Sequence, residues 1–182
     1  MRQPELPHRS LRDDPGERLR RMVGRVRARW LLRGCDAGRR VCAWRSVRVV
    51  SEGNVRVGDG VQFWSGPLAQ EIVCLRGAEL EIGADSMLNA GVSIRAVQKV
   101  RIGARCLLGA LVLVRDEENG RVAEVSIADD VWIGHGAIVC PGVSIGRGSV
   151  VGAGSVVRGD VPASSLAVGN PATIRPLRTQ NS

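Results

Sequence analysis

The sequence predicts a mainly β protein, a parallel β-helix made of hexapeptide repeats with an amphipathic helix in front of it. Near the C-terminus an aliphatic residue recurs at every sixth position, as Ile127, Ile133, Val139, Ile145, Val151 and Val157. A period of six fits neither a helix nor an alternating strand and is typical of a solenoid. Hydrophobic residues make up 44% of the 182 residues but aromatic residues only 3%, which suits a narrow aliphatic core. An arginine-rich segment with helical periodicity precedes the repeats.

Each hexad is expected to form one short strand and a turn. Three hexads then make one triangular coil, and coils stack at the strand spacing of about 4.8 Å. The position four residues after each ladder aliphatic has to be small or β-branched, because the sides of a narrow prism meet there at close-packed density. These positions hold Val131, Ala137, Val143, Ser149, Ser155 and Val161. Glycines follow several ladder residues and fit tight corners.

The segment before the repeats, residues 1–40, is expected to be a basic arm and an amphipathic helix. Asp14, Pro15 and Glu17 give an N-cap, a first-turn proline and a capping-box acid. An apolar face follows at helical spacing and consists of Leu19, Met22, Val23, Val26 and Trp30. The first fifty residues hold fourteen arginines against five acidic residues, while the whole chain has a net charge of +8. An anionic partner is therefore expected at this end of the chain.

This helix has two interpretations. It can cover the open end of the first coil, as terminal caps of solenoids do. It can also lie on an anionic membrane through residues 14–33, near a lipid-linked substrate. A nucleic-acid partner is not expected, because the basic run has little aromatic interleaving. Since no apolar run suits a membrane span or a signal peptide, we expect a cytoplasmic protein, peripheral at the inner membrane face under the second interpretation.

The periodicity between the helix and the strongest repeats is uneven. Residues 41–80 alternate loosely like strands, and clear hexads begin at Ile82. A two-residue slip after Val100 is expected to bulge outward at a corner. The rhythm breaks again after Val114, so residues 115–126 are expected to leave the prism as a loop.

From this periodicity we expect the β-helix to cover residues 41–162 and a C-terminal tail to cover residues 163–182. Pro171 and Pro176 argue against a long helix in that tail. The five cysteines are odd in number and form no C-x-x-C pair, so we expect reduced core residues. No metal is expected, because a zinc enzyme with three histidine ligands needs more than the one histidine in the repeats.

Four short motifs resemble the hexapeptide-repeat acyltransferases of the sugar, maltose and galactoside O-acetyltransferase type. They are VWIG at 131–134, PGVSIG at 141–146, GAGSVV at 152–157 and VGNPA at 168–172. The resemblance implies a left-handed winding of the β-helix and a homotrimer with active sites between subunits. It also implies transfer of an acetyl group from acetyl-CoA to a hydroxyl of a small-molecule or lipid-linked sugar acceptor.

The resemblance also implies binding residues. The positions that line the pantetheine groove in the family are Trp132, Gly134, Gly152, Ala153 and Gly154, although corner geometry alone would also explain these glycines. Arg175 and Arg178 could meet the nucleotide phosphates of CoA, or they could be solvated surface residues. Asn89 matches a position that touches the acceptor in sugar-modifying members, and a structural corner asparagine is the alternative.

The general base is the least defined role. The resembled family carries its catalytic histidine on a loop inserted where residues 115–126 break the repeats, and this loop has no histidine. The remaining candidates are His135, at a corner, and the loop carboxylates Asp116 and Glu118. A carboxylate near pKa 4.3 is about two units less basic than imidazole near 6.5. The chain is therefore expected to be a CoA-dependent O-acetyltransferase, with a catalytically silent β-helical scaffold as the alternative.

Overall fold

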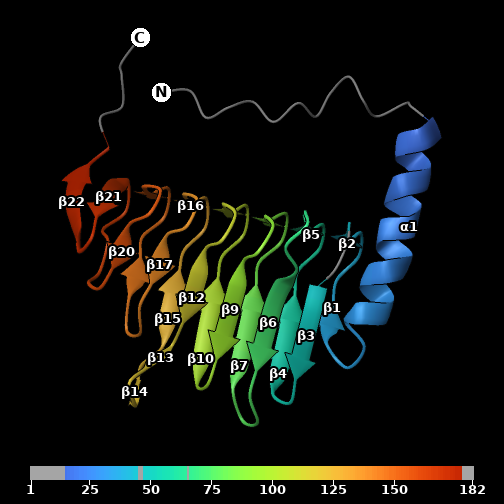
Figure 1. Ribbon diagram of the computed structural model, residues 1–182, viewed down its shortest axis with the longest axis horizontal. Helices are drawn as coiled ribbons and strands as arrows, with labels where there is room; N and C mark the ends of the chain where they lie inside the picture. Colours follow the sequence, from blue (N-terminus) through green and yellow to red (C-terminus); the bar gives the residue numbers. More distant parts are fainter. Residues whose placement is uncertain (1–14, 45–46, 65, 178–182) are drawn as a thin grey trace.

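The computed structural model describes residues 15–44, 47–64 and 66–177. The chain winds into a solenoid with three flat faces, and successive coils add one strand to each face (Figure 1). The helix α1 (Pro15–Leu31) stands at the N-terminal end, and a strand hairpin closes the other end. The predicted mainly β solenoid of parallel strands with one N-terminal helix is confirmed.

The strands of each face pair in register from coil to coil. Sheet 1 contains β1 (Asp36–Ala37), β4 (Asn54–Val57), β7 (Glu79–Ile82), β10 (Lys99–Ile102), β15 (Val125–Ile127) and β18 (Ser144–Ile145). Sheet 2 contains β2 (Cys42–Ala43), β5 (Gln62–Phe63), β8 (Met87–Leu88), β11 (Leu107–Leu108), β16 (Trp132–Ile133), β19 (Val150–Val151), β21 (Ser165–Gly169) and β22 (Ala172–Pro176). Sheet 3 contains β3 (Val47–Ser51), β6 (Gln70–Cys74), β9 (Ser93–Ala96), β12 (Leu113–Arg115), β17 (Ile138–Val139) and β20 (Val156–Val157).

The core is the predicted aliphatic ladder. On sheet 2, Leu88, Leu108, Ile133 and Val151 lie one above the other and are fully buried. The positions four residues after each ladder aliphatic are also buried, and Ser149 satisfies its hydroxyl there by donating to the carbonyl oxygen of Pro162 at 2.7 Å. A prism this narrow favours aliphatic side chains, which explains the composition, and Phe63 is the aromatic residue that its core contains.

The two-residue slip lies at a corner, as predicted, but at the one between β9 and β10, before Val100 and not after it. The extra residues there are Val97 and Gln98, and the strands on either side keep their register with the neighbouring coils. The carboxylate of Asp116 accepts the backbone N–H groups of this bulge. The bulge is therefore tolerated because a side chain from the next coil accepts hydrogen bonds from its backbone N–H groups.

The break after Val114 leaves the solenoid, as predicted, but as an ordered hairpin. It consists of β13 (Glu117–Glu118) and β14 (Arg121–Val122), which pair antiparallel and project from the edge of the prism (Figure 1). The turn between the two strands contains Asn119 and Gly120, both at positive φ. Such a turn is typical of a tight hairpin.

The predicted C-terminal tail is largely part of the solenoid. Strand β21 continues sheet 2 beside β19, and β22 folds back antiparallel on it. Ala167 is fully buried on top of Val151, so the ladder extends past residue 162. The prolines that argued against a helix fit a hairpin, since Pro171 lies in its turn and Pro176 ends its last strand. Residues 178–182, with Arg178, lie outside the described part.

Helix α1 covers the first coil, but through an unexpected side. Gly24, Ala28 and Leu32, just past the helix end, are buried, and Ala28 and Leu32 belong to the solenoid core. A Cβ on Gly24 would lie 3.5 Å from the carbonyl oxygen of Ala43, so a small residue permits this close approach. The predicted apolar face points away from the coil. The capping residue Asp14 lies outside the described residues, and no described helix is both long and apolar enough to cross a membrane.

Candidate functional site

A row of residues runs along the corner between sheets 2 and 3. Each member directly follows a sheet 2 strand and donates its backbone N–H to the next coil at 2.7–3.0 Å. In spatial order from the helix end, this corner row consists of Trp44, Trp64, Asn89, Gly109, Gly134 and Gly152. The row thus changes from aromatic to polar to bare backbone along the solenoid.

The glycine half of the corner row cannot carry side chains. A Cβ on Gly109 would lie 2.7 Å from the backbone nitrogen of His135, and one on Gly134 would lie 2.6 Å from that of Ala153. Ala153 and Gly154 follow the row and are exposed, and Gly154 has φ of 65° with open space around it. The small residues of the predicted cofactor site therefore form one strip, of which Gly134 is buried, Gly152 is half-buried and Ala153 and Gly154 are exposed.

A second line of residues crosses the outer surface of sheet 2 beside this strip. Trp132 pairs with Val150, Val150 with Leu166, and Leu166 with Arg175. Directly paired residues point to the same side of a sheet. The exposed Arg175 therefore lies on the same surface as the half-buried Trp132, toward the C-terminal end of the solenoid.

His135 stands alone beside the glycine strip. Its neighbours in the coils before and after are Ala110 and Ala153, which carry only methyl groups. Its carbonyl oxygen accepts the N–H of Gly154 at 2.8 Å, so the backbone is fixed while the imidazole is exposed. An exposed imidazole next to accessible backbone is placed to exchange a proton with a bound molecule.

Asn89 lies in a buried network of amides. Its Nδ2 donates to the carbonyl oxygen of Leu108 at 3.2 Å, and its own carbonyl accepts Nε2 of Gln70 at 2.9 Å. Gln70 is fully buried, and its Oε1 has no hydrogen-bond partner within the described part of the chain. The same Nε2 contacts the carbonyl of Trp64 at 3.2 Å, whose indole stacks on Trp44 with ring centroids 4.9 Å apart.

Sequence reasoning missed the residues on the helix side of Asn89. Trp64 is 42% exposed, and Gln70 connects it to Asn89. The uneven periodicity of residues 41–80 hid their register. Extending the hexad ladder backward from Leu88 to Phe63 would have placed Trp64 directly beside Asn89.

The loop carboxylates of Asp116 and Glu118 already accept hydrogen bonds from other groups of the protein. Asp116 is fully buried and accepts the backbone N–H groups of Val97, Gln98 and Lys99 at 2.8, 2.7 and 2.6 Å. Both of its oxygens therefore hold the bulged corner, and a catalytic role for Asp116 stays a prediction. Glu118 is bonded to Arg115 and, at 3.0 Å, to Arg158.

The candidate bases are not brought together within one chain. His135 lies at the corner between sheets 2 and 3, whereas Asp116 and Glu118 lie where the chain passes from sheet 3 to sheet 1. The strands of sheet 3 separate the two corners. A site using both sets would therefore have to combine corners of different protomers.

No cluster of metal-ligating side chains occurs among the residues that the structure describes. All five cysteines are free, and four of them are buried. Burial raises the pKa of the Cys106 thiol to about 11. Burial also raises the pKa of the Cys35, Cys74 and Cys140 thiols, which disfavours the reactive thiolate form.

Part of the chain matches a known family. Residues 124–159 match the family described as bacterial transferase hexapeptide (six repeats). A Schizosaccharomyces pombe protein named as a candidate acetyltransferase is 59% identical over 54 residues, which cover 30% of this chain. The match spans 25% of that relative's length.

Two solved structures are similar over more of the chain. One is a histidine-to-alanine mutant of GDP-perosamine N-acetyltransferase from Caulobacter crescentus with CoA and GDP-perosamine, 32% identical with a TM-score of 0.57, covering 74% of this chain and 56% of that one. The other is a hexapeptide-repeat acetyltransferase from Vibrio cholerae with acetyl-CoA, 26% identical with a TM-score of 0.55, covering 94% and 81%. The resemblance to hexapeptide-repeat acetyltransferases is confirmed.

Proposed function

We propose that this protein transfers an acetyl group from acetyl-CoA to a hydroxyl of a sugar or polysaccharide precursor. The observation that carries the proposal is the strip of small residues Gly134, Gly152, Ala153 and Gly154, in which Ala153 and Gly154 are exposed beside the exposed imidazole of His135. The similar structures from Vibrio cholerae and Caulobacter crescentus hold acetyl-CoA or CoA, and the latter also holds a nucleotide sugar.

The residues present fit the donor. An extended pantetheine arm can lie along this strip, because no side chain larger than the methyl group of Ala153 projects from it. Trp132 supplies an apolar wall beside the strip, and Arg175 offers a guanidinium to phosphate farther along the same surface. Arg178 remains a candidate for the same role. Bound acetyl-CoA would supply the activated thioester carbonyl.

His135 is our candidate for the general base. It is exposed beside the strip, whereas Asp116 is committed to the corner and Glu118 to two arginines. Its role would be to accept the acceptor hydroxyl proton as the oxygen attacks the thioester. A positioned base contributes about a hundred- to ten-thousandfold.

The acceptor belongs, in this proposal, at the aromatic end of the corner row. Asn89 supplies a polar group there, held through its carbonyl by the buried Gln70, and the exposed face of Trp64 supplies a surface on which a sugar ring can stack. The homotrimer is part of the proposal, because a cyclic assembly brings different corners of neighbouring prisms together. Glu118 of one protomer could then approach the strip of the next.

The test separates binding from chemistry. Acetyl-CoA is titrated calorimetrically into the wild type, Trp132→Ala and His135→Gln, and release of free CoA is then measured with a panel of sugars. We expect weaker binding for Trp132→Ala, and for His135→Gln unchanged binding with a rate at least about a hundredfold lower. The absence of heat at millimolar acetyl-CoA would refute the cofactor assignment.

A catalytically silent scaffold is the second candidate. The specific observation is that the β13–β14 hairpin has no histidine and that its two candidate carboxylates are engaged. A trimer that binds acetyl-CoA but releases no CoA with any sugar would favour this reading. Acceptor-dependent release abolished by His135→Gln would exclude it.

A further inference from the structure

The outer side of α1 carries an apolar stripe that the described part of the chain leaves uncovered. We define the stripe as Leu19, Met22, Val23, Val26 and Trp30, which are between 46% and 66% exposed. The helix packs on the first coil through Gly24 and Ala28 instead. At 3.6 residues per turn, the stripe centre lies nearly opposite this packing side. An exposed apolar surface of this kind marks an interaction site.

Arginines border the stripe on both edges. By helical position, one edge holds Arg18, Arg25 and Arg29 and the other holds Arg20 and Arg27. No acidic residue occurs between residues 18 and 35. The guanidinium of Arg33 lies 5.7 Å over the ring of Trp30. An apolar face with a tryptophan and flanking cations is typical of a helix that lies in a membrane interface.

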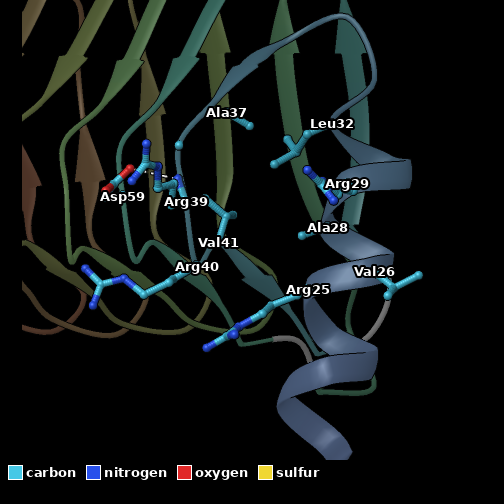
Figure 2. Close-up of a pocket in the computed structure, with 11 residues that line it drawn as sticks. Arg25, Val26, Ala28, Arg29, Leu32, Ala37, Arg39, Arg40, Val41 and Asp59 are labelled. Atoms are coloured by element: carbon cyan, nitrogen blue, oxygen red, sulfur yellow. Dashed lines mark hydrogen bonds between the residues drawn. The ribbon is translucent and has the colours of Figure 1, made fainter.

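One arginine edge opens into a cleft between α1 and the first coil. The cleft has a volume of about 580 Å³ and is lined by Arg25 and Arg29 from the helix and by Arg39 and Arg40 from the facing loop. Figure 2 shows Arg25 and Arg29 on the coil side of the helix and Val26 on its outer side. Asp59 is the acidic residue of the lining, and its carboxylate accepts the backbone N–H of Arg39 at 2.7 Å.

None of these four guanidinium groups has an acidic side-chain partner within the described residues. Four cations facing the single carboxylate of Asp59 repel one another, and a phosphate in the cleft would relieve that repulsion through charge-assisted hydrogen bonds. The cleft thus suits a phosphate-bearing headgroup, and the stripe suits an apolar layer.

We propose that this end of the solenoid docks on an anionic phospholipid bilayer. The stripe lies in the interface, the arginine edges lie among the headgroups, and the cleft receives a headgroup phosphate. Both earlier interpretations of the helix then hold at once, because one side caps the first coil and the opposite side meets the membrane.

Other occupants fit less well. A second copy of the helix packed stripe to stripe would bring two sets of arginines together, which is unfavourable. A nucleic acid would engage the arginines and leave the apolar stripe in water. An anionic bilayer complements the charges and the stripe together.

If the proposed function also holds, the acceptor is lipid-linked. Arg27 on α1 donates to the backbone carbonyl of Trp44 at 2.6 Å, so the helix touches the aromatic end of the corner row. A sugar carried on a membrane lipid would approach Trp64 and Asn89 from that side. This extension rests on the proposed acetyl transfer, whereas the docking itself does not.

The test is sedimentation of the full chain with vesicles of phosphatidylcholine alone or mixed with phosphatidylglycerol. A stripe variant, Val26→Gln/Trp30→Gln, and a cleft variant, Arg25→Gln/Arg29→Gln, are compared with the wild type. Glutamine keeps helix propensity, and all four positions are exposed, so folding is preserved. The matched control is Val122→Gln/Ile174→Gln, which removes exposed apolar side chains elsewhere.

We expect the wild type to bind the anionic vesicles and not the neutral ones. The affinity for anionic vesicles should fall at least about tenfold in the stripe variant and roughly thirtyfold in the cleft variant, which loses two charges. The control should bind like the wild type. Equal binding to neutral vesicles, or an unchanged stripe variant, would overturn the proposal. So would a stripe variant that falls to a smaller assembly in light scattering, or binding of single-stranded DNA in place of vesicles. Acetyl-CoA calorimetry on the same variants reports separately on the proposed function.

Discussion

Replacing Asp116 tests whether this carboxylate builds the corner or acts in chemistry. Its Oδ1 accepts the N–H of Val97, and its Oδ2 accepts those of Gln98 and Lys99, all at 2.8 Å or less. Asp116→Asn keeps the shape but replaces one oxygen by an NH₂ group. The best orientation keeps the oxygen toward Gln98 and Lys99 and turns the NH₂ toward the N–H of Val97.

The magnitude follows from these contacts. The charge-assisted hydrogen bond from Val97 is lost, and its N–H then faces the NH₂ group of the asparagine. The hydrogen bonds from Gln98 and Lys99 remain but are no longer made to a charged acceptor. A hydrogen bond to a charged group contributes about 1.5–3 kcal/mol, and a buried donor left unsatisfied costs about 1–3 kcal/mol. We therefore expect Asp116→Asn to lower the free energy of unfolding by about 3 kcal/mol.

The assay is urea unfolding followed by circular dichroism at one fixed protein concentration. Glu124→Gln is the control, since it removes the same charge from an exposed position of the same loop. If Asp116→Asn unfolds with the control's midpoint, the carboxylate does not hold the corner. A normal midpoint combined with lost acetyl transfer would restore Asp116 as a base candidate.

Three further predictions follow from the packing and the charges. Gly134→Ala places its Cβ 2.6 Å from a backbone nitrogen of the next coil and should cost about 2 kcal/mol in thermal unfolding. Gly159→Ala, whose Cβ meets nothing within 4 Å, should be near neutral. The hydrogen bond from Arg105 lowers the pKa of Asp130, so its stabilisation is present above the unfolded value near 3.9 and is lost as the pH falls through the folded value. Urea midpoints of Asp130→Asn and wild type should therefore differ at pH 7, by less than about 1 kcal/mol because the pair is exposed, and converge below pH about 4. Burial raises the pKa of Cys106 to about 11, so iodoacetamide at pH 8 should label this thiol in urea but not in the native protein, as peptide mass spectrometry would show.

The ladder was predictable because its period is imposed by the geometry of every coil. Ile133 and Val151 had to stack if the solenoid formed, and the register confirms it. The packing side of α1 was not predictable, because periodicity defines faces but does not say which one the protein buries. Here Gly24 and Ala28 allow close approach and the large residues stay outside.

The candidate site was likewise predictable only in part. The positions of the corner row follow from spacing, but only Gly109, Gly134 and Gly152 lie too close to the next coil for a side chain, whereas Trp44, Trp64 and Asn89 carry one at the same position. The role of Asp116 depends on a bulge in the preceding coil, and spacing alone does not bring the two together. The register of Trp64 was hidden because its coil departs from the hexad rhythm.

The corner row gives the proposed reaction a direction. Its C-terminal half is bare backbone that suits an extended cofactor arm, with Arg175 farther along the same side of the solenoid. Its N-terminal half ends in Trp64 and Trp44, which α1 touches through Arg27. A donor entering from the C-terminal end and an acceptor held at the helix end would meet where Asn89 gives way to Gly109, one coil from His135. The proposed membrane surface on α1 thus lies at the same end of the solenoid as the proposed acceptor site.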